Sequence, residues 1–148
     1  MTEPLRFSFD VACSAEHAFA VWTERIDAWW PADHSVTGRP AAVGLVAGVG
    51  GRIYERGAEG VAHDWGEITE WQPPNRLAYV WHLARDRADA TEVAINFASV
   101  GPAETRVEID HRGWERLGES APLWRERNQV GWDSLLPHYV TALAGQET

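Results

Sequence analysis

Three polar residues of the sequence could carry acid–base chemistry: Glu55, Tyr79 and His111. Each lies in a segment with strand-like alternation, on the face that it shares with apolar neighbours. Histidine titrates near neutrality, so His111 could act as a general acid or base with Glu55 or Tyr79 as its partner. The competing interpretation, which we favour, is a buried histidine held by hydrogen bonds. Glu55 is equally well explained as a solvated carboxylate at the rim of a sheet.

The sequence contains no motif of the common metal-binding, nucleophilic or nucleotide-binding sites. The histidines match no short zinc-binding spacing, and Cys13 is the sole cysteine, so we predict no metal site. The sequence has no nucleophile elbow, no phosphate-binding loop and no dinucleotide fingerprint, because the glycines at 48–51 are not followed by a helix. We therefore expect no cofactor.

The inner face of the predicted sheet follows from residues 104–112. Val107, Ile109 and His111 alternate there with residues that are all charged and must face water. His111 is therefore expected on the inner face. A tight turn at Pro73–Pro74 would set the register of the preceding hairpin. It predicts three opposite pairs: Trp71 with Arg76, Ile68 with Tyr79, and Gly66 with Trp81.

The order of elements predicts an α+β fold, with a curved antiparallel sheet wrapped around a long C-terminal helix. A helical pair follows the first strand, with Ser14 as its N-cap and a break near Thr23. The last helix is expected from about residue 120 to about 143. Residues 1–148 fit one domain. Strands are predicted at 5–11, 43–46, 51–57, 61–72, 76–83, 91–99 and 104–112.

Adjacent tryptophans close the helical pair. Neighbouring helical residues point about 100° apart, so Trp29 and Trp30 cannot share one contact. One is expected to continue the core stripe, and the other to face the mouth of a cavity or the following loop. Trp114 and Trp124 flank the approach to the long helix and are expected at the cavity entrance. Gly131 would either allow close packing or leave a void beneath that helix.

The composition narrows the range of partners. The chain has 13 basic and 22 acidic residues, a formal net charge of −9, which disfavours nucleic acid and membrane surfaces. No apolar run is long enough to span a membrane and the N-terminus has no signal-peptide pattern, so a cytoplasmic location is expected. The exposed edges of the sheet would allow a homodimer.

Taken together, a set of short motifs resembles the prokaryotic relatives of the activator of the ninety-kilodalton heat-shock chaperone's ATPase. The motifs are Gly50-Gly51-Arg52, Trp65-Gly66, Pro73-Pro74-Asn75-Arg76-Leu77, Trp81, Thr105-Arg106-Val107, His111-Arg112-Gly113-Trp114 and Gly131-Trp132…Leu135. Those relatives belong to the START/polyketide-cyclase (SRPBCC) superfamily, and the resemblance runs from about residue 7 to 143. It implies a helix-grip fold with a cavity between the sheet and the long helix.

Three functions fit these expectations. The first is the binding of a hydrophobic small molecule in the cavity. The second is an enzyme of the cyclase or dehydratase type that uses His111 in the same cavity. The third is a protein-interaction module that regulates a chaperone or another partner. The residues predicted to bind the ligand are Ile68, Tyr79, Trp81, Phe97, His111, Trp132 and Trp30.

Overall fold

The computed structural model describes residues 3–38, 40–83 and 87–145. Its strands are β1 (Leu5–Val11), β2 (Ala42–Leu45), β3 (Arg52–Arg56), β4 (Ala62–Gln72), β5 (Arg76–Trp81), β6 (Thr91–Gly101) and β7 (Glu104–Arg112). Its helices are α1 (Ala15–Thr23), α2 (Ile26–Trp29), two short 3₁₀ helices η1 (Arg87–Asp89) and η2 (Trp114–Ser120), and the long α3 (Ala121–Gly145). The predicted α+β element order is confirmed.

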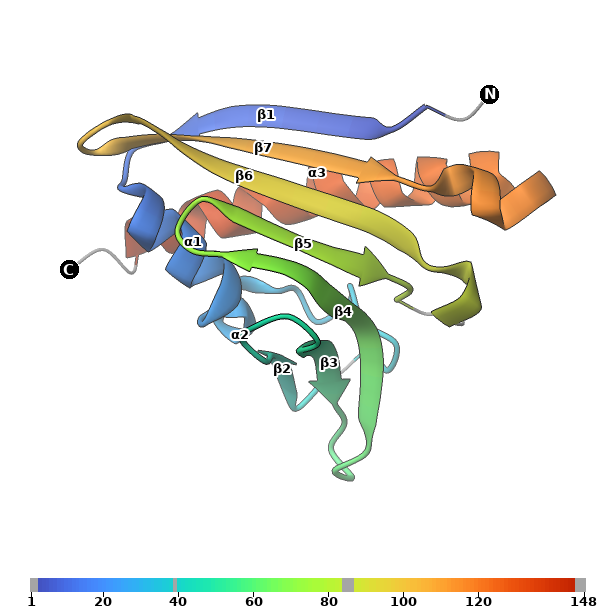
Figure 1. Ribbon diagram of the computed structural model, residues 1–148. Helices are drawn as coiled ribbons and strands as arrows, with labels where there is room; N and C mark the ends of the chain where they lie inside the picture. Colours follow the sequence, from blue (N-terminus) through green and yellow to red (C-terminus); the bar gives the residue numbers. More distant parts are fainter. Residues whose placement is uncertain (1–2, 39, 84–86, 146–148) are drawn as a thin grey trace.

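Within these residues the strands form one antiparallel sheet of seven strands, in the order β1-β7-β6-β5-β4-β3-β2. The sheet curls around the helices, with α3 running behind β7 and β6 and with α1 at one end (Figure 1). Irregular register in β3–β4, β4–β5 and β6–β7 accompanies this curvature, because bulges bend a strand. The expected wrapping of a sheet around a long C-terminal helix is therefore present.

The helical pair forms where local signals place it. The Ser14 side chain caps α1 by accepting a hydrogen bond from the backbone N–H of His17 at 3.2 Å. The predicted break near Thr23 is confirmed, since α2 begins again at Ile26. Helix α2 ends at Trp29, two residues before Pro31, which disfavours helical geometry at the residue before it.

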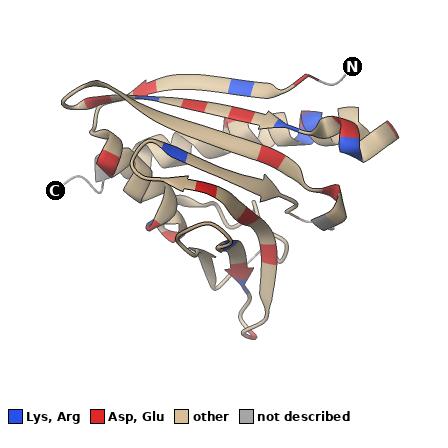
Figure 2. Cartoon of the chain, viewed as in Figure 1, with Lys and Arg blue, Asp and Glu red and all other residues tan. Residues whose placement is uncertain are grey.

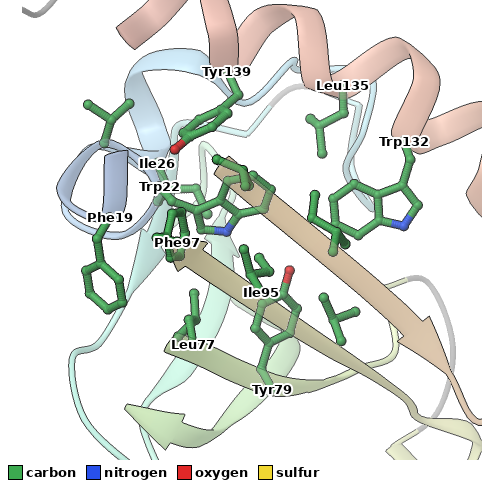
Figure 3. Packing of buried hydrophobic residues seen from close by; sticks show 14 of the residues in the cluster. Phe19, Trp22, Ile26, Leu77, Tyr79, Ile95, Phe97, Trp132, Leu135 and Tyr139 are labelled. Carbon is green, nitrogen blue, oxygen red and sulfur yellow. The ribbon is translucent and has the colours of Figure 1, made fainter. Parts of the chain in front are cut away.

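The core centres on Trp22, which α1 projects toward the inner face of the sheet. Its ring lies 4.7 Å from that of Tyr139, 6.1 Å from that of Trp132 and 6.5 Å from that of Phe97, measured between centroids. Figure 3 shows Trp132, Leu135 and Tyr139 projecting from α3 into this cluster. The phenol of Tyr139 also donates to the carbonyl of Ala18 at 2.7 Å, so the core aromatics tie α3 to α1.

Most charged residues of the strands are exposed, with Glu55 as a buried exception. Acidic and basic positions are interspersed along the strands and do not gather in one basic stripe (Figure 2). Arg112 donates to both carboxylate oxygens of Asp110, and Arg6 donates to Asp110 from the neighbouring strand. The hydrogen bond from Arg112 is the main reason that the pKa of Asp110 lies below its usual range.

The register predicted for the β4–β5 hairpin is confirmed at one end and wrong at the other. Ile68 lies opposite Tyr79, and Gly66 lies opposite Trp81. Near the turn, however, Trp71 lies opposite Leu77 in place of Arg76, because the register shifts by one residue between Ile68 and Glu70. Trp71 consequently packs against Phe19 of α1, with ring centroids 5.1 Å apart.

None of the helices among residues 3–38, 40–83 and 87–145 is both long enough and apolar enough to cross a membrane.

Gly66 is required where β4 and β5 meet. A Cβ atom at this position would lie 2.1 Å from the carbonyl oxygen of Val80, a backbone atom that can move only with its strand. We expect Gly66→Ala to lower the free energy of unfolding by about 1–3 kcal/mol in urea denaturation. Gly101→Ala is the control, because its nearest contact would be an ordinary 3.8 Å from the Cβ of Glu104. Equal stabilities of the two variants would contradict this packing argument.

Candidate functional site

A pocket of about 180 Å³ opens between the first half of α3, the segment that follows α2 and the end of β5. It is mainly apolar and is open to solvent on one side. Four tryptophans dominate its lining, together with three polar side chains. The lining residues are Trp30, His34, Trp81, Leu83, Trp124, Arg127, Asn128, Gly131, Trp132 and Leu135.

Short-range contacts fix the indole of Trp30, the residue that caps the C-terminus of α2. Its Nε1 donates to the carbonyl of His34 at 2.7 Å, which folds the loop after α2 back over the ring. The ring packs against Trp65 and Trp81, with centroid distances of 5.1 and 5.8 Å. Because the indole N–H is already bonded, Trp30 offers the pocket mainly a flat apolar surface.

Trp29 is the member of the pair that continues the core stripe, as the sequence predicts for one of the two tryptophans. It is buried in the core, and its Nε1 donates to the carbonyl of Val21 at 2.8 Å. Its ring contacts Trp22 and Tyr139 at centroid distances of 5.1 and 5.2 Å. The two adjacent tryptophans therefore serve different purposes, one in the core and the other in a pocket wall.

The wall on α3 follows a helical stripe. Trp124, Asn128, Gly131, Trp132 and Leu135 recur at spacings of three and four residues, which places them on one side of the helix. The guanidinium of Arg127 lies 5.1 Å from the centre of the Trp124 ring, an arrangement typical of a cation–π contact.

Gly131 helps to keep the pocket open. A Cβ atom at this position would meet no atom within 4 Å, and its backbone conformation does not require glycine. The void that the sequence allows beneath the helix is thus present beside Gly131, and a larger side chain would project toward it.

His111 is fully buried and does not line the pocket. The Trp132 indole Nε1 donates to its Nδ1 at 3.0 Å, and Thr91 Oγ1 lies 2.6 Å from its Nε2. Because an indole N–H can only donate, Nδ1 must be unprotonated, and the ring carries its proton on Nε2. The Trp114 ring packs against that of His111 in a tilted arrangement, with centroids 4.4 Å apart, and Trp114 is buried and does not line the pocket.

Glu55 is buried and anchors a loop. The alternative that the sequence left open, a solvated carboxylate at the rim of the sheet, is wrong. The Glu55 carboxylate accepts hydrogen bonds from the backbone N–H of Val36, from the N–H and hydroxyl of Thr37 at 3.2 and 2.9 Å, and from the Trp65 indole at 2.8 Å. Burial alone would raise the pKa of Glu55, but these donors outweigh it and hold the pKa below its ordinary value. Glu55 is therefore ionised and ties the loop at 36–37 to β3.

Tyr79 is the third residue considered for acid–base chemistry. It is buried in the core, and this burial raises the pKa of its phenol far above the usual range, although a hydrogen bond with Trp22 opposes the shift. The phenol therefore stays protonated and has no access to the pocket.

Of the predicted ligand-binding residues, Trp30, Trp81 and Trp132 line the pocket. Ile68, Tyr79, Phe97 and His111 do not line it and are buried in the interior. Trp124 also lines the pocket, and its predicted place at the entrance stays a prediction. Whether any of these residues binds a ligand stays a prediction.

The sequence analysis missed the polar lining residues His34, Arg127 and Asn128. The helical stripe that runs through Trp124, Gly131 and Trp132 could have identified Asn128, whereas His34 lies in a loop without periodicity. Across residues 3–38, 40–83 and 87–145, no three histidine, cysteine, aspartate or glutamate side chains are grouped so that they could hold a metal ion.

The anchoring role of Glu55 predicts a pH-dependent loss of stability. Because its folded-state pKa lies below the ordinary value of 4.5, its stabilising effect is complete above that pH and is lost as the pH falls through the lower, folded value. Glu55→Gln should therefore lower the free energy of unfolding by about 1–3 kcal/mol near neutral pH. The gap to wild type should narrow in urea titrations below about pH 4. Exposed Glu59→Gln is the control, and a gap that is independent of pH would refute the ionised anchor.

Comparisons with known proteins agree with this architecture. The chain matches the family described as "Activator of Hsp90 ATPase homolog 1-like protein" over residues 12–144. No curated protein matches the chain. Among solved structures, an anthrahydroquino-γ-pyrone synthase, Txn09, is 38% identical over 80% of this chain and 82% of that chain, with a TM-score of 0.60.

Two further structures show the same fold. The self-sacrificing resistance protein CalC from Micromonospora echinospora is 26% identical, with a TM-score of 0.73, and the match covers 99% of this chain and 97% of that chain. An Hsp90 activator from Plasmodium falciparum is 20% identical, with a TM-score of 0.68, over 97% of this chain and 96% of that chain. The resemblance seen in the sequence is confirmed: the chain belongs to the activator of Hsp90 ATPase homolog 1-like family and has the helix-grip fold of its relatives.

Proposed function

We propose that the protein binds a planar aromatic small molecule in the pocket between α3 and the end of β5. The observation that carries this proposal is the convergence of four indoles, those of Trp30, Trp81, Trp124 and Trp132, on one partly open pocket. Aromatic rings gain stacking and edge-to-face contacts against such walls beyond the burial of apolar area. An aliphatic ligand of the same size would lack those contacts.

The size of the pocket limits how much of the ligand it encloses. Its volume of about 180 Å³ only slightly exceeds the roughly 150 Å³ of an engineered cavity that binds benzene. It is smaller than the roughly 300–1,000 Å³ that encloses a drug-sized ligand. We therefore expect one or two rings to enter, while the rest of a larger ligand extends through the open side.

The polar lining favours a ligand with oxygen substituents. The guanidinium of Arg127, the amide of Asn128 and the imidazole of His34 all border a surface that is otherwise apolar. A few polar groups in an apolar pocket orient the ligand and make binding selective. Phenol, quinone or carboxylate oxygens on the ring would suit Arg127, whose guanidinium is always charged.

Similarity to known proteins supports a small-molecule ligand over a protein partner. Txn09, whose name describes a synthase of an anthrahydroquino-γ-pyrone, shares 38% identity with this chain. The likeness to an Hsp90 activator, at 20% identity, supports the common fold alone. Regulation of a chaperone therefore remains the weaker hypothesis, and a homodimer stays a prediction from the exposed sheet edges.

A substitution that fills the pocket tests the proposal directly. Wild type should bind 1,2-dihydroxyanthraquinone saturably, as measured by quenching of tryptophan fluorescence and by calorimetry. Gly131→Leu should weaken this binding by roughly tenfold or more, which corresponds to about 1.4 kcal/mol, because the new side chain would project toward the space that the ring needs.

The matched control is Val130→Leu, which places the same leucine on an exposed position of α3 and should leave the affinity unchanged. Leucine is a better helix former than glycine, so unfolding is not an expected cause of lost binding. Absence of saturable binding by wild type, or equal affinity of Gly131→Leu and wild type, would refute the pocket as the binding site.

A further inference from the structure

We infer that His34, oriented by Asp33, is a general base in this pocket, and that the protein catalyses proton transfer on the planar aromatic molecule bound there. The inference rests on the proposed function and deepens it from binding to catalysis. Asp33 would act as a positioning residue, because its side chain does not line the pocket.

The loop after α2 holds His34 against the pocket. The backbone N–H of His34 donates to the carbonyl of Pro31 at 3.1 Å, and its own carbonyl accepts from the Trp30 indole at 2.7 Å. The imidazole is largely covered, with 20% of its side chain exposed, and it forms part of the pocket lining. A wall of the pocket and the candidate base are therefore fixed by the same local contacts.

The hydrogen bond between the two side chains determines which nitrogen can act as the base. His34 Nδ1 lies 2.8 Å from Asp33 Oδ1. An ionised carboxylate can only accept, so Nδ1 carries the proton in the neutral ring and Nε2 keeps its lone pair. Within the described part of the chain, Nε2 has no hydrogen-bond partner. A carboxylate behind one imidazole nitrogen, with the other facing a substrate, is the arrangement that suits a general base.

Two other buried polar groups, His111 and Glu55, are not free to act in this way. Both ring nitrogens of His111 are hydrogen-bonded, and Trp132, which bonds one of them, itself lines the pocket. Glu55 is held by four donor groups. His34 combines an oriented imidazole with a position in the pocket lining.

The charges around His34 suit the formation of an anion. Its hydrogen bond and its charge together hold the pKa of Asp33 below the usual range, and His138 on α3 adds a smaller effect in the same direction. Arg127 lines the same pocket from α3. The carboxylate stabilises the imidazolium after proton transfer, and the guanidinium stabilises the ligand anion.

The proposed reaction needs no co-reactant. Nε2 removes a proton from a phenolic O–H, or from a C–H beside a ring carbonyl, and the electron pair stays on the ligand as a phenolate or enolate. That anion attacks or rearranges within the same molecule, and the imidazolium returns the proton to a different atom. The net change is an isomerisation or a ring closure, with atoms and electrons balanced.

A generic base-sensitive probe tests this step without knowledge of the natural substrate. In 5-nitrobenzisoxazole, removal of the ring C–H proton breaks the N–O bond and releases a coloured nitrile phenolate. Wild type should accelerate this elimination, and the rate should rise with pH, as expected of a base that acts in its unprotonated form. His34→Gln should reduce kcat/KM roughly 100-fold and abolish the pH dependence.

Two further variants separate catalysis from structure. Asp33→Asn should lower kcat while leaving KM close to the wild-type value, as expected of a positioning residue. His63→Gln, which removes a histidine from β4 outside the pocket, should behave as wild type. A urea unfolding midpoint of His34→Gln equal to that of wild type would show that the fold itself is intact.

The outcomes distinguish this inference from the proposed function. In one outcome, wild type binds the anthraquinone and His34→Gln catalyses elimination of the benzisoxazole as fast as wild type. His34 is then not the base, and the binding proposal stands. In another outcome, wild type binds the anthraquinone but accelerates the benzisoxazole elimination no more than free imidazole does. Catalysis is then refuted. If wild type binds neither compound, both proposals fall together.

Discussion

The hydrogen bond from Trp132 to His111 is the contact on which the pocket most depends, because it fixes α3 against the inner face of the sheet. It has only one sensible direction, since the indole must donate and Nδ1 must accept. The series of hydrogen bonds continues through Thr91. Its hydroxyl lies 2.6 Å from Nε2 of His111 and donates to the carbonyl of Trp81 at 3.3 Å. Two walls of the pocket, Trp132 and Trp81, are thus joined by one buried network. In such a network each lost member leaves another polar group unsatisfied.

A second buried group, Glu55, organises the opposite side. Its carboxylate holds the end of the loop that carries His34, through Val36 and Thr37, and it also bonds the indole of Trp65. Trp65 in turn packs on Trp30, which bonds the carbonyl of His34. The buried polar residues therefore position the site, and we assign its chemistry to a residue in the loop that they hold.

The sequence predicts the frame well because the frame follows from periodicity. Alternation in β7 correctly places His111 with Val107 and Ile109, and the Ser14 cap and the break near Thr23 are local signals that the structure confirms. The register error at Trp71 arises from a bulge, an extra residue that strand alternation does not reveal.

The location of the cavity was harder to predict. The Trp22 ring packs against Phe97 in the interior, and the open volume lies beside Trp124. The sizes and directions of individual side chains decide where space stays open, and neither can be read from the order of elements. The sequence did not identify His34 as a lining residue for a related reason. A loop residue gains its role from contacts that periodicity does not encode. The cytoplasmic location likewise stays a prediction from composition.

The contacts among the tryptophans have an optical consequence. Trp22, Trp29, Trp30, Trp65 and Trp81 form a continuous series of ring contacts with centroid spacings between 5.1 and 5.9 Å, and Trp132 joins it at 6.1 Å from Trp22. At such spacings the transition dipoles of neighbouring indoles couple, and excitation energy migrates from ring to ring before it is emitted. An acceptor beside Trp30 would collect energy absorbed as far away as Trp22. Quenching of tryptophan emission by such an acceptor would therefore include light absorbed by rings that do not line the pocket.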